Sequence, residues 1–168
     1  LIVREVRRLT GFDRVMVYRF GPQGDGTVIA EDKQDDLESF LGLRYPDSDI
    51  PKQAKHLYTL SWLRLIPTVH YEPVGLVAAP GADPSRLDMS YGTLRSVSPL
   101  HLEYLKNMGV GASMSISLIK EGQLWGLIAC HHNEAKFVPY DLRTMCEFIG
   151  QLMSTEIAEK EANEHLDY

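Results

Sequence analysis

The strict alternation in one seven-residue segment restricts the fold more than any other feature of the chain. In SMSISLI (113–119), serines occupy every second position and apolar residues occupy the positions between them. Successive side chains of a β-strand point to opposite faces, so this segment predicts a strand with one apolar and one hydroxyl face. The apolar run LWGLIACHH (124–132) follows after the short linker KEGQ, which contains Gly122. Together the two runs predict a β-hairpin.

A second hairpin is predicted near the beginning of the chain. VMVYRF (15–20) is rich in β-branched and aromatic residues, and TVIAE (27–31) follows the turn-rich sequence GPQGDG. This pattern is typical of two antiparallel strands joined by a turn.

Helices are predicted in four places. Apolar spacing indicates a first helix that is closed by Gly11 and a last helix that begins at Pro139. Two more are predicted after Ser48–Pro51 and Ser98–Pro99, each with a Ser or Asp as capping candidate. Hairpins with helices at both ends indicate an α+β domain built on an antiparallel sheet. The Pro- and Gly-rich stretch 60–95 has no clear element, and so long an irregular segment in a compact domain is often functional.

The predicted last helix carries an apolar stripe followed by a charged end. The stripe consists of Leu142, Met145, Cys146, Ile149, Leu152, Met153 and Ile157. The sequence AEKEANEHLDY then continues without a Gly or Pro stop, which fits either a solvated end or a helix that enters another domain. Because isolated helices are marginal in water, we expect residues 158–168 to be ordered only by pairing with a second copy or with downstream sequence.

The size and charge of the chain exclude several classes of protein. Its 168 residues suit a single domain spanning 1–168, and the uncapped helices at both ends suggest that this domain was excised from a longer multidomain chain. With 17 Lys+Arg against 23 Asp+Glu, the net charge of −6 disfavours nucleic acid as a partner. No apolar run is long enough to span a membrane, and two cysteines make no disulfide framework. We therefore expect a reduced, cytoplasmic setting with no membrane partner.

No catalytic motif is present, so the chain is not expected to be an enzyme. It contains no P-loop, no GxSxG and no GxGxxG. His131 and His132 are neighbours on one predicted strand and point to opposite faces, so they cannot readily hold one metal ion. Turn formation and helix capping explain Asp47 and Asp49 in YPDSDIP more simply than an acidic catalytic pair does.

Two groups of polar residues each fit two interpretations. His101 and Tyr104 lie three residues apart on one predicted helix and share a face, which suits either packing or a binding site. The hydroxyl face of strand 113–119 is either a solvent-facing surface or the wall of a pocket for carboxylates or phosphates. In the second case Arg64 and Arg95 would add positive charge, since guanidinium pairs well with carboxylate.

Taken together, these segments resemble the GAF domain of phytochromes, the bilin-binding red-light receptors, and most closely the bacteriophytochrome branch. The resemblance implies a GAF fold, with a central antiparallel sheet flanked by helices and a bilin cleft on one side. The sequence departs from the family pattern at Asp47, because the family typically has a PASDIP-type segment where this chain has YPDSDIP. The segments that carry it are FDRVMVYRF (12–20), VIAE (28–31), LGLRYPDSDIPKQAKHLY (41–58), LRSVSPLHLEYLKNMGVGASMSISL (94–118) and LWGLIACHH (124–132).

The resemblance also implies roles for individual residues around a linear tetrapyrrole. Asp49 is expected to place its backbone carbonyl near the pyrrole nitrogens and its side chain near ring D. His101 is expected to support protonation of the inner pyrroles, and His131 to approach the ring D carbonyl. The other residues assigned to bilin binding are Tyr18, Tyr45 and Tyr104 around ring D, Arg64, Arg95, Ser113 and Ser115 at the propionates with Tyr58 in support, and Ile50, Pro51 and Ser98 beside them.

The identity of the bilin depends on one departure from the plant and cyanobacterial pattern. Those phytochromes carry the linking cysteine immediately before the histidine of SPxH, and here Leu100 occupies that position. Bacteriophytochromes use a cysteine in an N-terminal extension instead. The resemblance therefore implies biliverdin rather than phycocyanobilin, with no thioether at Leu100 or at Cys130, whose side chain is expected to face away from His131. The other partners implied are the N-terminal extension, a downstream domain and a second copy in a homodimer.

The function implied is that of a red/far-red photoreceptor module, in which light isomerises the 15,16 double bond of the bilin and the change is relayed to a downstream output domain. Any kinase or other output activity would lie outside this chain. Three alternatives stay open: a GAF domain for another small ligand such as a cyclic nucleotide, a dimerisation unit, and an engineered near-infrared fluorescent protein derived from this family.

Overall fold

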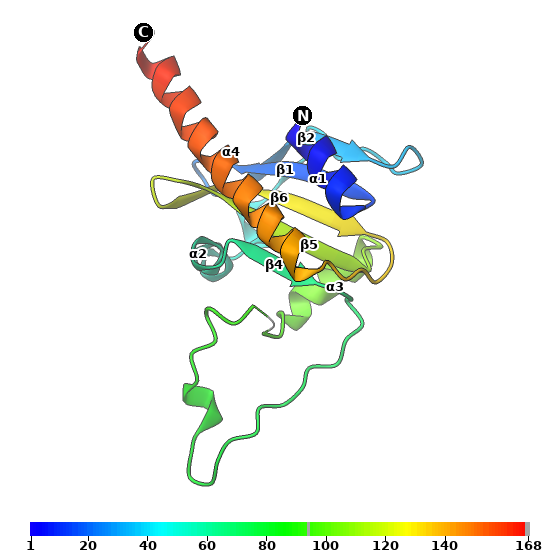
Figure 1. Cartoon of the computed structure of the whole chain (residues 1–168), viewed down its shortest axis with the longest axis vertical. Coiled ribbons are helices and arrows are strands. Elements are labelled where there is room, and N and C mark those ends of the chain that lie inside the picture. The colour runs from blue at the N-terminus through cyan, green and yellow to red at the C-terminus, as the bar shows by residue number, and fades with distance from the viewer. Residues whose placement is uncertain (94, 167–168) are drawn as a thin grey trace.

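A single six-stranded antiparallel sheet forms the centre of the molecule (Figure 1). The computed structural model describes residues 1–93 and 95–166, so Leu94 and the last two residues of the expected 1–168 domain lie outside the described residues. The strand order across the sheet is β3-β2-β1-β6-β5-β4. The strands are β1 (Arg14–Phe20), β2 (Gly26–Lys33), β3 (Arg44–Tyr45), β4 (Leu63–Ile66), β5 (Ala112–Lys120) and β6 (Gln123–His132).

Both predicted hairpins are confirmed. β1 pairs with β2, and β5 pairs with β6, in each case antiparallel. The β5–β6 turn places Glu121 at φ 51° and Gly122 at φ 75°. Two consecutive positive φ angles match the twist of the flanking strands, which explains the glycine in KEGQ. β4 lies within the stretch that the sequence left unassigned, and it pairs with β5 at the edge of the sheet.

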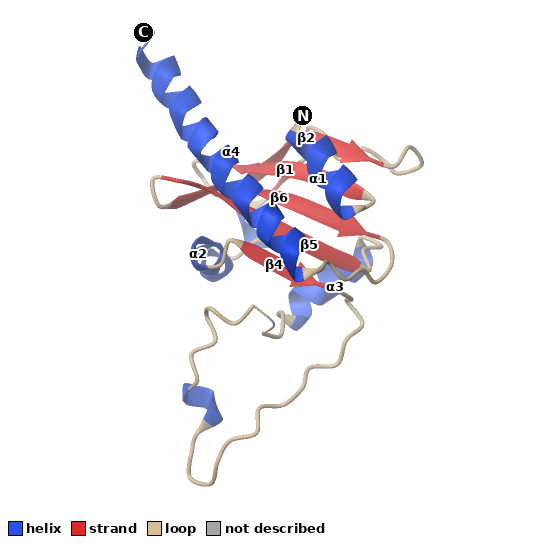
Figure 2. Ribbon diagram, in the orientation of Figure 1, coloured by secondary structure: helices blue, strands red, loops and turns tan. Residues whose placement is uncertain are grey.

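Helices cover the two faces of the sheet differently (Figure 2). α1 (Ile2–Thr10) and α4 (Tyr140–Leu166) cross one face, whereas α2 (Lys52–Leu60) and α3 (Pro99–Asn107) border the other. The α+β architecture predicted from the sequence is therefore confirmed. Between β4 and α3 the chain forms a long, mostly exposed loop, the excursion, which extends away from the sheet and contains the short 3₁₀ helix η2 (Pro84–Arg86). None of the helices within the described residues combines the length and the apolar character needed to cross a membrane.

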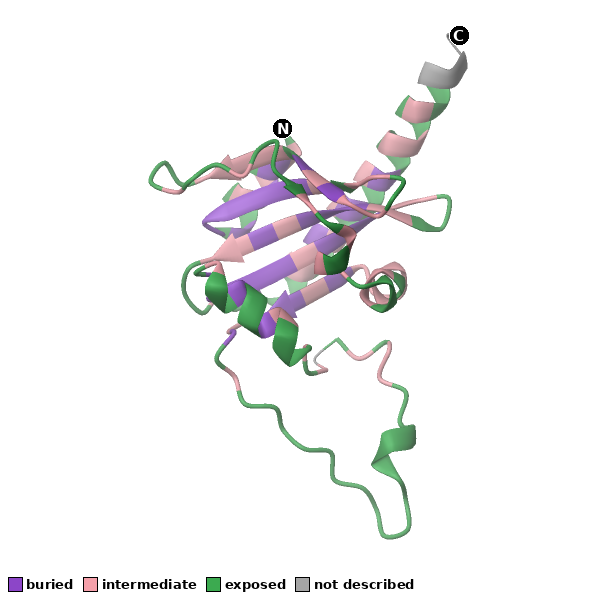
Figure 3. Ribbon diagram, turned by 180° about the vertical axis from the view of Figure 1, so that it is seen from behind, coloured by how far each residue is buried: buried purple, intermediate pink, exposed green. Residues whose placement is uncertain are grey.

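The main core lies between the sheet and the pair α1 and α4. Met114, Ile116 and Leu118 are fully buried there, which confirms the apolar face of β5. The backbone of α4 touches β5, because a Cβ on Gly150 would lie 2.5 Å from Cγ2 of Ile116. Beside this contact the Ser154 hydroxyl accepts a hydrogen bond of 2.9 Å from the amide of Ile119. Seen from behind, the central strands carry many buried residues along their length (Figure 3).

Two details of the predicted helices are wrong. Met145 and Leu152 are 49% and 50% exposed, so they do not belong to the buried stripe of α4. A helix that packs on one side of a sheet buries only a narrow stripe, and these two residues lie beside it. The stripe that packs against the core consists of Leu142, Cys146, Ile149, Met153 and Ile157.

The predicted caps are also absent. Ser98 is the N-cap residue of α3 but its side chain makes no capping bond. Asp49 does not cap α2, because it belongs to the 3₁₀ helix η1 (Asp47–Asp49) and Pro51 is the N-cap residue. The backbone amide of Asp49 instead donates to the carbonyl of Pro46, at 3.1 Å. Ile50 and Pro51 therefore separate Asp49 from the start of α2.

The distal part of α4 is bound to the sheet through Glu161. Its carboxylate accepts bonds from Trp125 Nε1 at 3.0 Å, from Lys120 Nζ, and from Arg19 at 3.3 Å. Bonds from Lys120 and Trp125 hold the pKa of Glu161 below its usual value. The expectation that residues 158–168 find partners only in another copy or in downstream sequence is thus wrong for Glu161. Residues 167 and 168 of that stretch lie outside the described residues.

We expect Glu161→Gln to accelerate amide exchange of residues 158–163 by about two- to tenfold, because the carboxylate bonds to three segments are lost together. Hydrogen-exchange mass spectrometry measures this, and the emission of Trp125 reports the same contact. Glu159→Gln removes an equal charge from an exposed position two residues earlier and should change neither signal. Equal acceleration in both variants would contradict the anchoring role of Glu161.

Candidate functional site

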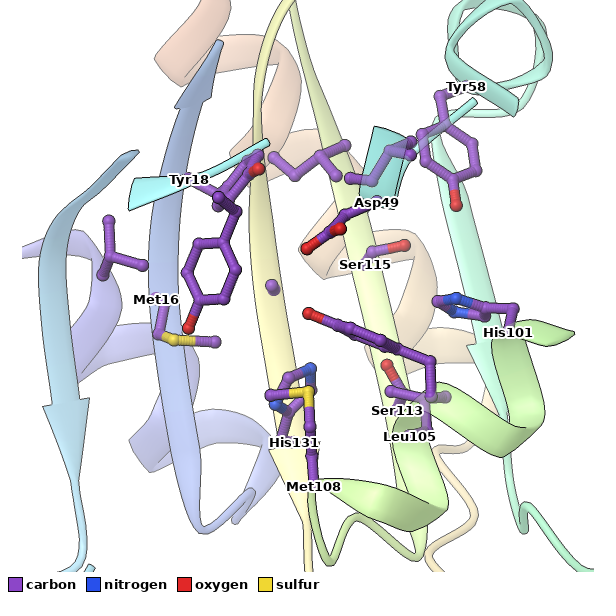
Figure 4. A pocket seen from close by; sticks show the side chains of 16 residues that line it. Met16, Tyr18, Asp49, Tyr58, His101, Leu105, Met108, Ser113, Ser115 and His131 are labelled. Carbon is purple, nitrogen blue, oxygen red and sulfur yellow. The ribbon is translucent and has the colours of Figure 1, made fainter. Parts of the chain in front are cut away.

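A cleft of about 740 Å³, its open mouth included, lies on the sheet face opposite the main core. β1, β5 and β6 form its floor, and η1, α2 and α3 form its walls (Figure 4). Because side chains alternate along each strand, the residues that face the cleft are those that turn away from α4. The lining consists of Met16, Tyr18, Val28, Tyr45, Asp49, Ile50, Tyr58, His101, Tyr104, Leu105, Met108, Ser113, Ser115, Leu127, Ala129 and His131.

The serine face of β5 forms a polar wall and is not a solvent surface. Arg64 donates from Nε to Ser115 Oγ and from Nη1 to Ser117 Oγ, both at 2.9 Å. Its guanidinium also lies 3.9 Å from the centroid of the Tyr58 ring. Burial lowers the pKa of Arg64 to about 10, so the group stays charged at neutral pH. Its Nη2 atom is buried without a hydrogen-bond partner, which leaves one donor of a charged group available.

His101 and Tyr104 share one face of α3, as their spacing predicts. Their rings stack with centroids 6.3 Å apart and an angle of 14° between the planes. Burial, followed by the charge of Arg64, lowers the pKa of His101 below its usual value, so the ring is neutral at pH 7. Burial and the nearby Asp49 raise the pKa of Tyr104 to about 12.

Two more tyrosines and Asp49 close the other end of the cleft. The rings of Tyr18 and Tyr45 lie 5.9 Å apart at 48°. Burial and the charge of Asp49 raise the pKa of Tyr18 far above its usual value, and burial also raises the pKa of Tyr45. Both phenols therefore keep their protons at neutral pH and can act as hydrogen-bond donors to a ligand. Asp49 itself points into the cleft from η1 (Figure 4).

The two adjacent histidines of β6 are separated by the sheet, as predicted. His131 lines the cleft, whereas the Nδ1 of His132 lies 2.9 Å from the carboxylate of Asp13. Burial, then the charges of Arg14 and His101, lower the pKa of His131 to about 4. The Nδ1 atom of His131 is buried and has no partner, so a neutral imidazole with free hydrogen-bonding capacity faces this end of the cleft.

A buried ion pair borders the cleft beside His131. Arg14 lies opposite His131 in the β1–β6 register, and its guanidinium pairs with Glu31; the two side chains are 7% and 4% exposed. Arg14 also donates to the carbonyl of Glu38 at 2.6 Å, and the amide of Phe40 donates to Glu31 at 3.0 Å. The pair therefore fixes the loop after β2. Sequence reasoning did not single out either residue.

Four of the predicted site residues do not line the cleft, and the first of them, Arg64, lies behind the lining and is bonded to Ser115 and Ser117. Arg95 donates to the loop carbonyls of Met89, Ser90 and Gly92 and does not reach the cleft wall. Ser98 and Pro51 are exposed at the starts of α3 and α2. Each lies next to a lining element in the sequence, but the turn of the backbone directs its side chain outward.

Six apolar lining residues were missed by sequence reasoning. Leu127 and Ala129 share the face of His131 on β6, and Met16 shares that of Tyr18 on β1, so strand alternation alone identifies them. Leu105 and Met108 follow His101 at four and seven residues on α3, which is helical same-face spacing. The sixth is Val28 on β2.

The arrangement suits binding better than catalysis. The cleft combines an apolar floor, a charged guanidinium behind a row of hydroxyls, and neutral histidine and tyrosine side chains. Within residues 1–93 and 95–166, no cluster of three or more His, Cys, Asp or Glu side chains could hold a metal ion. Such a site can hold a flat apolar ligand that carries anionic groups at one side and hydrogen-bonding groups elsewhere.

Comparisons with known proteins agree with this description. The GAF domain family model matches residues 1–157. The chain is 56% identical to cyanobacterial phytochrome B of Nostoc sp. over 98% of its own length, and 50% identical to a bacteriophytochrome of Pseudomonas aeruginosa over 91%. It spans only 22% and 21% of those two proteins.

Solved structures give the same result. The chromophore-binding domain of Stigmatella aurantiaca phytochrome P1 matches with a TM-score of 0.89 and 55% identity, over 92% of this chain and 51% of that one. The photosensory core module of the same phytochrome matches with a TM-score of 0.92 and 55% identity, over 99% and 33%. The chain therefore belongs to the GAF domain family, and its relatives within that family are phytochromes and bacteriophytochromes.

Proposed function

We propose that this chain is the light-sensing module of a phytochrome-type photoreceptor and that its cleft binds a linear tetrapyrrole. The observation that carries the proposal is the meeting of Asp49, His101 and His131, which come from three distant segments, around one apolar cleft.

The residues of the cleft fit the chemistry of a bilin. A cationic, extended π-system requires a flat apolar slot, which Met16, Leu127 and Ala129 supply on the floor. Its two propionates require donors, and the buried Nη2 of Arg64 lacks an acceptor. The free Nδ1 of His131 is a second unsatisfied group that a ligand carbonyl or a bridging water would complete.

When bound, the bilin supplies absorption of visible light and a 15,16 double bond that light isomerises. The protein residues hold and orient it. Asp49 presents its backbone carbonyl to the pyrrole nitrogens, with Ile50 beside it. His101 exchanges a proton with the pyrrole system, and neutral His131 orients the ring D carbonyl. The remaining proposed contacts are Tyr18, Tyr45 and Tyr104 around ring D, and Arg64, Ser113, Ser115 and Tyr58 at the propionates.

Arg95, Ser98 and Pro51 complete the proposed set at its edge. Arg95 is held by three loop carbonyls, so a contact with a propionate requires that it exchange at least one of these bonds. A charge-assisted bond to a carboxylate is stronger than a bond to a carbonyl, which favours that exchange. Ser98 and Pro51 contribute through the backbone that leads into α3 and α2.

We further propose that the module acts within a longer protein. An N-terminal extension and a downstream output domain are the proposed partners in the same chain, and a second copy is the third. The apolar residues Met145, Phe148 and Leu152 support the last of these, because they are 49%, 58% and 50% exposed on one side of α4.

Biliverdin is the bilin that we propose, held without a thioether to this chain. Leu100 replaces the cysteine of the plant and cyanobacterial pattern, and it is 77% exposed. Cys130 is fully buried on the core side of β6, where burial raises the pKa of its thiol well above the usual value. A protonated, inaccessible thiol does not attack a vinyl group.

The test is to mix the purified protein with biliverdin, record the visible spectrum before and after red light, and run a denaturing gel with zinc staining. We expect a new red-absorbing band, a light-dependent change of that band, and no bilin fluorescence on the gel. Leu100→Cys should instead retain phycocyanobilin covalently. A spectrum equal to that of free biliverdin at excess protein would overturn the proposal.

Alanine at Asp49 or His101 is expected to impair photoconversion far more than folding. Asp49 makes no capping bond, and the stack of His101 on Tyr104 contributes only about 0.5–1.5 kcal/mol to the free energy of unfolding. His101→Ala should also shift the pH at which the bound bilin loses its proton, because a proton-exchanging neighbour is removed. Urea unfolding and a pH titration of the visible spectrum measure the two effects. A variant with unchanged spectrum, titration and photoconversion would contradict these roles.

A further inference from the structure

Lys55 lies at the point where three segments behind the cleft meet. From α2, its ammonium donates to the carbonyl of Gly24 at 2.7 Å and to the carboxylate of Asp47 in η1. The same Nζ atom lies 4.8 Å from the centroid of the Phe20 ring at the end of β1. The side chain is only 17% exposed. One ammonium therefore connects the β1–β2 turn, η1 and α2.

The β1–β2 turn contacts η1 closely at Gly24, and the contact depends on the absence of a side chain there. A Cβ on Gly24 would lie 2.2 Å from Oδ1 of Asp47 and 3.1 Å from Nζ of Lys55. Gly24 also has φ +86°, a conformation that other residues adopt only with strain. The backbone of the turn thus lies directly against the ion pair and covers Lys55, whereas the Asp47 side chain stays 44% exposed.

Two of the three connected segments carry a lining residue of the cleft, and so does β1, the strand that leads into the turn. η1 ends at Asp49, two residues after Asp47, and α2 carries Tyr58, one turn after Lys55. The ring of Phe20 meets that of Tyr18 edge to face, with centroids 5.2 Å apart. A displacement of Lys55 would therefore shift Asp49, Tyr58 and Tyr18, which line the cleft.

Asp47 is the position at which this chain departs from the PASDIP-type segment. The PASDIP-type segment has alanine at this position, which cannot bind an ammonium group. The bond from Lys55 holds the pKa of Asp47 below its usual value, so the carboxylate is ionised at neutral pH. The carboxylate adds a charged bond to the one that Lys55 makes with the turn.

We propose that Lys55 is a positioning residue that fixes η1, and with it Asp49, against the cleft, and that Asp47 is its ionic partner in η1. Lys55 acts through its neighbours and contacts no ligand. The inference concerns the geometry of the unliganded protein, and its effect on bilin photochemistry rests on the proposed function.

Amide exchange in the unliganded protein tests the positioning directly. The amides of Asp49 and Gly24 are bonded within the segments that Lys55 connects, to Pro46 and Gly21 respectively. In Lys55→Met we expect both to exchange at least about tenfold faster, and Asp47→Ala should give a smaller acceleration. Lys55→Arg should restore slow exchange, because it keeps a donor and a positive charge.

Lys52→Met is the matched control, since it removes the same charge from an exposed position of the same helix. The amide of Met114 in β5 reports any global loss of stability and should change in none of the variants. Equal exchange of Asp49 in Lys55→Met and Lys52→Met would overturn the proposal.

The second readout is the spectrum of the biliverdin-bound protein. Lys55→Met should broaden the red band and reduce the yield of photoconversion, while Lys52→Met should leave both unchanged. Faster exchange of Asp49 without any spectral change in Lys55→Met would show that Lys55 does not position the cleft. If the parent protein binds no biliverdin, the proposed function fails, and the exchange data alone then decide whether Lys55 fixes η1.

Discussion

Arg14→Met is expected to lower the free energy of unfolding by about 3–5 kcal/mol, because it leaves the carboxylate of Glu31 buried without its cation. The two side chains are 7% and 4% exposed, so water cannot replace the lost partner. Burial by itself raises the pKa of Glu31, but bonds from Ser39, Phe40 and Arg14 outweigh it and hold the pKa below its usual value. Urea unfolding at pH 7 measures the loss.

Two further variants separate the buried charge from simple loss of packing. Arg44→Met removes an arginine that is 77% exposed and lies 3.5 Å from Asp25, and it should change the free energy of unfolding by less than about 1 kcal/mol. The double variant Arg14→Met, Glu31→Leu removes both charges and should recover more than half of the loss. A double variant as unstable as the single one would refute the explanation by an unpaired charge.

Acid is expected to destabilise the protein through His131. Its pKa is lowered to about 4 in the folded chain and is about 6.5 in the unfolded chain. Between these two pH values the unfolded chain binds a proton that the folded chain excludes, so stability falls as the pH decreases through this window. Above pH 6.5 the contribution is fully present. From pH 7 to pH 4.5 the predicted loss from this group is up to about 2–3 kcal/mol.

His131→Gln should remove this part of the acid sensitivity. The measurement compares the difference in free energy of unfolding between pH 7 and pH 4.5 in the parent protein and in the variant. His70→Gln, at an exposed position, should behave like the parent. A carbon-13 NMR titration of the histidine rings checks the cause independently, and a His131 ring that titrates near pH 6.5 in the folded protein would contradict the prediction.

The strands were predictable because their patterns are local. Alternation over residues 113–119 determines which side chains share a face, and the buried Ile116 and Ser117 lie on the two faces that it indicates. The same rule separates His131 from His132. The cleft residues Asp49, His101 and His131 were named through the family resemblance, since no spacing rule connects segments that lie so far apart in the chain.

What sequence reasoning missed depends on contacts between distant segments. The pair of Arg14 and Glu31 is not apparent from the chain, because each residue alone resembles a surface charge on a strand. The bonds of Arg95 to loop carbonyls depend on the excursion between β4 and α3, for which no periodicity exists. The exposed Met145 and Leu152 were assigned to the buried stripe because an apolar residue at helical spacing does not reveal how wide a stripe the sheet covers.

The alternation along β6 also separates two kinds of evolutionary change. Leu127, Ala129 and His131 face the cleft, and Ile128 and Cys130 between them face the core. Between residues 127 and 131, a substitution at an odd-numbered position changes the lining of the cleft and leaves the packing against α4 intact, whereas one at an even-numbered position does the reverse. The cleft can therefore change one strand position at a time during evolution without loss of the core that holds α4.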